Sequence, residues 1–284
     1  MMIAIALAGA GVVSLGAASA QASMQTGGEN IFSYRVGEVR VVLLSEGQNE
    51  GNPRILIDAP AEMTAPYLSE AGTYPSATNA FAVISPDGTT LVDAGLGIRL
   101  TENLAAAGIE RVDRIMLTHM HGDHIGGLLK EGEPTFEGVT MSLDPVEAKY
   151  WAAQGGDAAR VLELYKPRPL QVWTLDGVPA GRDGIYAITA PGHTPGHTMF
   201  LVASRGERLL IWGDLTHAMA VQMPHPEISV TYDVDPDDAR VSRLETLEHV
   251  AAQGIPVAGM HIAYPGIGTI EKAAQGYSFT PVAE

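Results

Sequence analysis

Cysteine is absent from this chain of 284 residues. Without it there can be no disulfide framework, no thiolate ligand for a metal ion and no cysteine nucleophile. Any metal site in the protein must therefore be built from histidine, aspartate and glutamate side chains.

Basic residues are scarce. The chain has 17 Lys and Arg against 33 Asp and Glu, which gives a formal net charge of −16 at pH 7. Such a surface repels the phosphates of nucleic acids and the headgroups of anionic membranes. The composition therefore argues against nucleic acid and other polyanions as partners.

The N-terminus has no charged side chain before Glu29. It runs from an apolar segment into small residues that fit a cleavage site after Ala20 or Ala22. We interpret residues 1–22 as a secretory signal peptide, which predicts a periplasmic or secreted protein with no stable membrane association once the leader is removed. An N-terminal membrane anchor is the alternative, but this run is weakly hydrophobic and barely long enough to span a bilayer.

The rest of the chain has no internal repeat, low-complexity tract or linker, so we expect residues 23–284 to form one domain. Its 46% of hydrophobic residues can bury a substantial core. Strand patterns are clear over 38–44 and over 79–95, where Pro86-Asp87-Gly88 divides two apolar runs as a hairpin turn would.

Helices are expected over 99–108, ended by Gly108, and over 235–254, where Asp235 is a good N-cap and Gly254 a stop. A buried strand is predicted over 114–120, and further strand-like runs lie between 184 and 214. Strands interrupted by helices, twice over, predict packed sheets with helices outside them, in the α+β class.

Three of the nine histidines fall within the stretch "LTHMHGDHIGG". It holds four polar side chains in six residues, spaced H-x-H-x-D-H: His119, His121, Asp123 and His124. On a loop between a strand and a helix, alternate residues can converge on one ion while the Asp-His pair faces a second. Imidazole and carboxylate groups suit zinc, iron, manganese or cobalt. This density indicates a metal site better than a histidine-rich surface loop.

More candidate ligands follow later strand-like runs: His193 in "APGHTPGHT", Asp214 in "IWGDLTH" and His261 in "AGMHIAYPG". Each residue alone is as well explained as a hydrogen-bonded histidine or a turn aspartate. Side chains at the ends of strands gather at one edge of a sheet, so together with the loop they predict a site for two ions.

These motifs resemble the metallo-β-lactamase-fold hydrolases over nearly the whole mature chain. The resemblance implies an αββα sandwich of two mixed sheets with two divalent metal ions between them, most typically zinc, with cobalt, manganese or iron as alternatives. It implies that His119, His121 and His193 bind the first ion, that Asp123, His124 and His261 bind the second, and that Asp214 bridges both. Within the fold, "WGDLTHAMAVQMPHPEISVTYDVDPDDAR" most resembles methyl parathion hydrolase and nearby lactonases and arylesterases.

The chemistry expected of such a centre follows from its charge. Two divalent ions lower the pKa of a bound water to about 7, so a hydroxide shared between them is available at neutral pH. It can attack an ester, lactone or phosphotriester, while a metal polarises the carbonyl or phosphoryl oxygen. Asp214 is a candidate to relay the proton to the leaving group.

Four other residues are candidates for supporting roles. The resemblance places Asp93, in "LVDAG", where it would brace the ligand loop, with a solvent-facing turn residue as the alternative. His197 is expected to be structural rather than a ligand. His217 would lie at the rim, where some lactonases have a tyrosine, and could donate a hydrogen bond to the substrate or simply pack. Trp151, in "KYWAAQGG", would be an aromatic wall of the pocket or a core residue.

The leading hypothesis is therefore hydrolysis of a neutral lactone or aryl ester, with phosphotriester cleavage as a promiscuous side activity. An organophosphate hydrolase is the close alternative. Asp214 argues against a β-lactamase, since enzymes of that branch with the same histidine loop normally lack a carboxylate there. A non-catalytic metal-binding protein is the alternative from another class. Relatives of this fold often form dimers, so the resemblance also implies a homodimer.

Overall fold

The computed structural model describes residues 30–179 and 181–283. The predicted signal peptide lies outside the described residues. Among the helices of the described part, none is long and apolar enough to cross a membrane.

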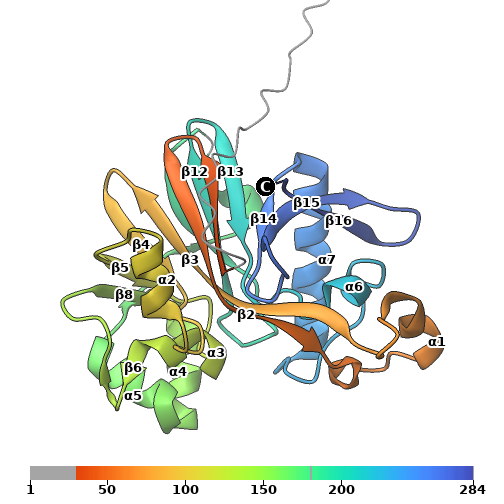
Figure 1. The fold of residues 1–284 in the computed structure, drawn as a ribbon, viewed down its shortest axis with the longest axis horizontal. Coiled ribbons are helices and arrows are strands. Elements are labelled where there is room, and N and C mark those ends of the chain that lie inside the picture. Colours follow the sequence, from red (N-terminus) through yellow and green to blue (C-terminus); the bar gives the residue numbers. More distant parts are fainter. Residues whose placement is uncertain (1–29, 180, 284) are drawn as a thin grey trace, which may run out of the picture.

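Two sheets of seven strands form the centre of the molecule (Figure 1). The first sheet has the order β1-β2-β3-β4-β5-β8-β9, with the bounds β1 Ile31–Val36, β2 Val39–Gly51, β3 Tyr74–Ser85, β4 Gly88–Val92, β5 Arg114–Met116, β8 Thr140–Leu143 and β9 Arg168–Pro169. The second has the order β10-β11-β12-β13-β14-β15-β16, with the bounds β10 Val172–Trp173, β11 Gly184–Thr189, β12 Thr198–Ser204, β13 Glu207–Ile211, β14 Val257–Ala258, β15 Ile267–Lys272 and β16 Tyr277–Pro281. Both sheets mix parallel and antiparallel pairs.

The remaining elements surround the sheets. They are the small pair β6 Leu129–Lys130 and β7 Glu133–Pro134, the helices α1 Ala61–Thr64, α2 Leu100–Ala106, α3 Gly122–Ile125, α4 Pro145–Gln154, α5 Gly156–Tyr165, α6 Met219–Gln222 and α7 Pro236–Gln253, and the 3₁₀ turns η2 Pro53–Ile55, η3 Ala65–Tyr67, η4 Gly126–Leu128 and η5 Leu175–Gly177. Helices α2, α4 and α5 lie on one side of the sheets and α7 on the other (Figure 1).

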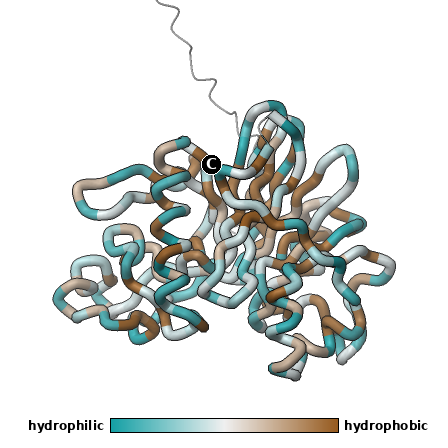
Figure 2. The backbone as a smooth tube through the Cα atoms, turned by 180° about the vertical axis from the view of Figure 1, so that it is seen from behind, coloured by the Kyte–Doolittle hydropathy of each residue, from teal (hydrophilic) through white to brown (hydrophobic). Residues whose placement is uncertain are grey.

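The core shows why the sheets are covered on both faces. Val41 and Leu43 of β2 join the cluster between the two sheets, whereas Val42 and Leu44 join the cluster under α2 and α5. Because successive side chains of a strand point to opposite faces, a fully apolar run must be buried on both sides. Hydrophobic segments accordingly gather at the centre of the molecule (Figure 2). The expected αββα sandwich is confirmed.

Local predictions hold where short-range chemistry decides. Strands β3 and β4 form the expected hairpin, with Ser85 opposite Gly88. The side chain of Asp235 accepts the N–H groups of Asp237 and Asp238 at the start of α7, and Gly254 ends the helix in the left-handed conformation at φ 60°.

Two strand predictions were wrong in extent. Strand β5 ends at Met116 rather than continuing to 120, because the N–H of Thr118 leaves the ladder and donates to Oδ1 of Asp93 at 2.8 Å. Strand β2 continues past 44 to Gly51, since an irregularity between Ser45 and Gly47 lets it stay paired with β3. The extension forms one wall of the cavity described below.

Candidate metal centre

The histidine loop connects β5 to the short helix α3. His119 and His121 precede this helix, and Asp123 and His124 lie within it. The other three predicted ligands come from the second sheet: His193 follows β11, Asp214 follows β13 and His261 follows β14. All seven side chains meet at one edge of the sandwich.

The first group consists of His119, His121, His193 and Asp214, each with a donor atom within 4.8 Å of the others. Nδ1 of His121 lies 3.0 Å from Nε2 of His119 and 2.9 Å from Nε2 of His193. Three imidazole nitrogens this close together suit a shared cation better than hydrogen bonds to one another.

The second group consists of Asp123, His124 and His261, under the same distance criterion. Asp214 lies between the groups: its Oδ1 is 3.1 Å from Nε2 of His124, and its Oδ2 is 3.1 Å from Nε2 of His261. The same Oδ2 lies 3.4 Å from Nε2 of His193, in the first group. Asp214 therefore lies where one carboxylate could contact ions held by both groups.

Contacts behind the histidines determine which nitrogen faces the centre. Nδ1–H of His124 donates to Oδ2 of Asp93 at 2.7 Å, and Nδ1–H of His261 donates to the carbonyl of Ala77 at 2.9 Å. With the proton held on Nδ1, the lone pair of Nε2 points into the site. Nδ1 of His119 lies 3.0 Å from the hydroxyl oxygen of Thr118, which can accept the Nδ1 proton in the same way.

Two buried atoms at the middle of the site lack a hydrogen-bond partner among the described residues: Nε2 of His124 and Oδ1 of Asp214. An unpartnered lone pair and an unpartnered carboxylate oxygen are costly in a protein interior. Both would be satisfied by a cation between them. The donor set, all nitrogen and oxygen, therefore fits zinc and similar divalent ions.

Two of these side chains, His121 and Asp214, have the charge state that a bound cation requires. Burial lowers the pKa of His121 to about 4, which favours the neutral imidazole that binds a metal. Burial alone would raise the pKa of Asp214, but the imidazoles of His124 and His261 outweigh it and hold this pKa well below its usual value. Asp214 therefore carries its negative charge at neutral pH.

Asp93 and His197 lie just behind the candidate ligands. Asp93 is fully buried and accepts hydrogen bonds from His124, from the N–H of Thr118 and from the hydroxyl of Thr118 at 2.6 Å. Nε2 of His197 accepts the N–H of Asp214 at 3.0 Å, and its Nδ1–H donates to the carbonyl of Ala190. Neither residue belongs to the two ligand groups, and both hold residues that do.

His217 is closer to the centre than the rim position expected for it. It is only 6% exposed, its Nε2 lies 3.1 Å from Oδ2 of Asp214, and its ring stacks on that of His261 at 4.8 Å. The reason is Gln222, whose Oε1 accepts the N–H of His217 and turns the loop back over Asp214. Nδ1 of His217 is buried without a hydrogen-bond partner among the described residues.

The prediction of Trp151 as a wall of the substrate pocket needs correction. Its indole is not among the described residues that line the cavity over the site. It packs instead against the core under α5, donates its Nε1–H to Glu147 at 2.6 Å and meets the ring of His121 edge-on at 5.3 Å. The i, i+4 spacing on α4 puts Glu147 and Trp151 on one helix face, where the indole N–H reaches the buried carboxylate.

Sequence reasoning also missed two buried acids. Asp233 accepts Nδ1–H of His193 at 2.9 Å, and Glu147 accepts N–H groups from Met120 and Gly196. Asp233 and His193 are 40 residues apart, so no local pattern could pair them. For Glu147, the helical spacing to Trp151 was the available signal.

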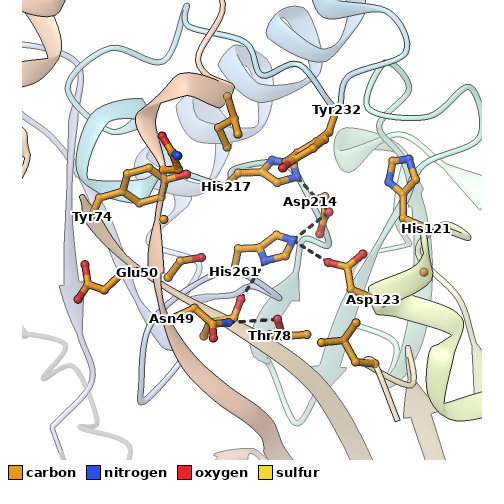
Figure 3. Close-up of a pocket in the computed structure, with 17 residues that line it drawn as sticks. Asn49, Glu50, Tyr74, Thr78, His121, Asp123, Asp214, His217, Tyr232 and His261 are labelled. Carbon is orange, nitrogen blue, oxygen red and sulfur yellow. Dashed lines mark hydrogen bonds and ion pairs between the residues drawn. The ribbon is translucent and has the colours of Figure 1, made fainter. Parts of the chain in front are cut away.

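A cavity of about 640 Å³ opens over the two groups. Figure 3 shows Asp123, Asp214, His217 and His261 converging at its floor and Tyr232 above them. Apolar and aromatic side chains line its sides: Ile55, Tyr74, Leu96 and Tyr232. Among the described residues that line it there is no lysine or arginine.

Comparison with known proteins agrees with this geometry. The family model of the Metallo-beta-lactamase superfamily matches residues 73–252, and the chain belongs to this superfamily. Its fold is the metallo-beta-lactamase fold.

Several solved structures are similar to the chain. The hydrolase AbOPH of the beta lactamase superfamily is 28% identical, with a TM-score of 0.77 over 90% of this chain and 98% of that one. AidC, a dizinc quorum-quenching lactonase, is 23% identical, with a TM-score of 0.79 over the same shares of the two chains. A quorum-quenching N-acyl homoserine lactone lactonase is 17% identical, with a TM-score of 0.59 over 83% of this chain and 100% of that one.

A short match also exists to the anti-Pycsar protein Apyc1 of Paenibacillus sp. (strain J14). It is 40% identical over 42 residues, which are 15% of this chain and only 17% of that protein.

Proposed function

We propose that this protein is a hydrolase of neutral lactones or aryl esters that works with two divalent metal ions, most simply zinc. The observation that carries the proposal is the position of Asp214 between two groups of ligand-type side chains, under a cavity whose walls include apolar and aromatic side chains. The similarity to AidC, a dizinc lactonase, supports the same conclusion.

In this proposal His119, His121 and His193 hold the first ion, Asp123, His124 and His261 hold the second, and Asp214 contacts both. Ions bound there would activate water and polarise the scissile carbonyl. Asp214, whose Oδ2 faces the imidazoles of both groups, is placed to take a proton and pass it to the leaving group. His217, which lines the cavity next to Asp214, is placed to hydrogen-bond the substrate.

The lining supports this choice of substrate class. Ile55, Leu96 and the two tyrosines offer an apolar surface to an acyl chain or aromatic ring. Without a lysine or arginine in the lining to neutralise it, an anionic substrate would face Glu50 and Asp123. A neutral ester or lactone is the class that fits. We also propose that the mature enzyme is exported, since residues 1–22 have the composition of a leader.

The experiment is metal analysis of the purified protein together with kcat/KM over a panel of lactones, aryl esters, phosphotriesters and β-lactams. We expect two ions per chain, highest kcat/KM on a lactone or aryl ester, loss of turnover with a chelator and recovery with zinc. Phosphotriesters at the head of the panel would make organophosphate hydrolysis the main activity instead. β-Lactams at the head would refute the substrate class, and two bound ions without turnover on any substrate would indicate a metal-binding protein.

A further inference from the structure

Glu147 is fully buried at the start of α4, next to the metal centre but outside it. Its Oε1 accepts the N–H of Met120 at 3.2 Å and Nε1–H of Trp151 at 2.6 Å. Its Oε2 accepts the N–H of Gly196 at 3.0 Å. A buried carboxylate is tolerated when such donors satisfy it, and bonds of this charge-assisted kind are strong.

The two backbone donors belong to the two loops that supply the first ligand group. Met120 lies between His119 and His121, and Gly196 lies three residues after His193. The third donor, Trp151, places its ring edge-on against His121. One carboxylate thus connects the segments of all three histidines of the first group. Among the hydrogen bonds of the described residues, none joins Glu147 to Asp123, His124 or His261 of the second group.

The His193 loop lies directly on α4 because residue 196 is glycine. A Cβ at Gly196 would lie 2.3 Å from the backbone nitrogen of Glu147, closer than packed atoms can approach. The glycine therefore lets its own N–H reach Oε2. The His193 loop and α4 are therefore in backbone contact at Gly196, where no side chain would fit.

We infer that Glu147 is the positioning residue that sets the spacing of the first metal group, by tying the His119–His121 loop to the His193 loop. The inference rests on the proposed function, since it takes these histidines to be metal ligands. It assigns the carboxylate a role specific to one of two sites, which a merely stabilising buried acid would not have.

The direct test is Glu147→Gln. The amide has nearly the same shape as the carboxylate but only one acceptor oxygen. Oε1 accepts two N–H groups and Oε2 accepts one, so we expect the amide oxygen to take the place of Oε1. Its NH₂ then faces the N–H of Gly196, and the His193 loop loses that hydrogen bond. We expect zinc affinity at the first site to fall about 10- to 100-fold, as is typical when a group supporting a metal ligand is changed. The second site should keep its affinity.

The matched control is Glu46→Gln. Glu46 is also a buried acid that accepts backbone N–H groups, those of Leu96, Gly97, Arg99 and Leu100, but the loop that it holds carries none of the first-group residues. This variant should lose folding stability and keep first-site affinity. Gly196→Ala approaches the same contact from the loop side, leaves Glu147 intact and should also weaken the first site.

The readouts are competition titration of zinc against a chromophoric chelator and anomalous diffraction, which shows which position has lost its ion. Selective loss from the first site in Glu147→Gln supports the inference. Wild-type affinity at both sites, or equal loss from both, overturns it while the proposed function stands. If Glu147→Gln does not fold, Gly196→Ala decides by the same criteria. A wild-type protein that binds no metal would instead refute the proposed function.

Discussion

Nδ1–H of His193 donates to Oδ1 of Asp233 over 2.9 Å, joining the loop after β11 to the loop before α7. The other oxygen of Asp233 accepts the N–H of Val230 at 3.0 Å, so the carboxylate is itself held in place. This pair determines that Nε2 of His193, and not Nδ1, faces the metal centre.

Asp233→Asn should weaken zinc binding about tenfold, because a neutral amide makes His193 a less basic ligand. Competition titration with a chelator measures the affinity. Asp235→Asn, two residues away, is the matched control: Asn caps a helix as well as Asp does, so this variant should bind zinc like the wild type. Wild-type zinc affinity in Asp233→Asn, or an equal loss of zinc affinity in both variants, would contradict a role for Asp233.

Asp214→Asn should lower kcat about 10²- to 10⁴-fold, the usual contribution of a group that transfers a proton in the reaction. If Asp214 delivers that proton to the leaving group, the loss will be larger for an alkyl ester than for a nitrophenyl ester, whose leaving group needs no proton. Steady-state kinetics on the two esters, with metal content measured in parallel, make the comparison. A variant that retained both metals and full activity would exclude the relay.

His217→Phe should lower kcat/KM about 10- to 100-fold, the equivalent of one hydrogen bond to a charged or strongly polarised group. Phenylalanine keeps the ring stacked on His261 but removes both nitrogens. Metal content should stay at two ions per chain. Unchanged kcat/KM would mean that His217 only packs, and loss of an ion would mean that it is a ligand.

Gly213→Ala should disturb the metal centre through His197. Gly213 has φ +59°, and a Cβ there would lie 2.5 Å from Nε2 of His197, the atom that holds the N–H of Asp214. Gly254 has φ +60° with open space around it, so Gly254→Ala carries the same backbone strain without the clash. We expect both variants to lose roughly 1–2 kcal/mol of unfolding free energy from that strain. Only Gly213→Ala should also lose zinc affinity, measured by competition titration; normal zinc binding in both would refute the prediction.

Tyr74 should make the stability of the fold sensitive to alkaline pH. Burial, with the nearby phenol of Tyr232, raises the pKa of Tyr74 to about 12 from its usual 10. A raised folded-state pKa contributes stability that is fully present below pH 10 and is lost as the pH rises through about 12. Denaturant unfolding between pH 9 and pH 12 should therefore show a shallower loss for Tyr74→Phe. If the unfolding free energies of the wild type and Tyr74→Phe fell in parallel over this pH range, the raised pKa of Tyr74 would be contradicted.

Local sequence decided much of the fold. The capping by Asp235, the stop at Gly254 and the hairpin turn before Gly88 depend on chemistry within a few residues, and all three were predictable. The H-x-H-x-D-H spacing likewise placed four candidate ligands on one loop. His193, Asp214 and His261 were recognisable because side chains at strand ends gather at one sheet edge.

The tertiary structure alone decided what surrounds these side chains. Asp233 reaches His193 across 40 residues and Glu147 reaches Gly196 across 49, distances along the chain at which no periodicity or motif carries information. Trp151 shows the same limit. An aromatic residue in this segment was compatible with a pocket wall, but in the folded protein its indole donates to Glu147 and packs edge-on against His121. The sequence by itself determined which groups could bind a cation, because that is a property of side-chain chemistry. Which groups hold them at the right spacing was decided only when two sheets packed and brought distant loops into contact.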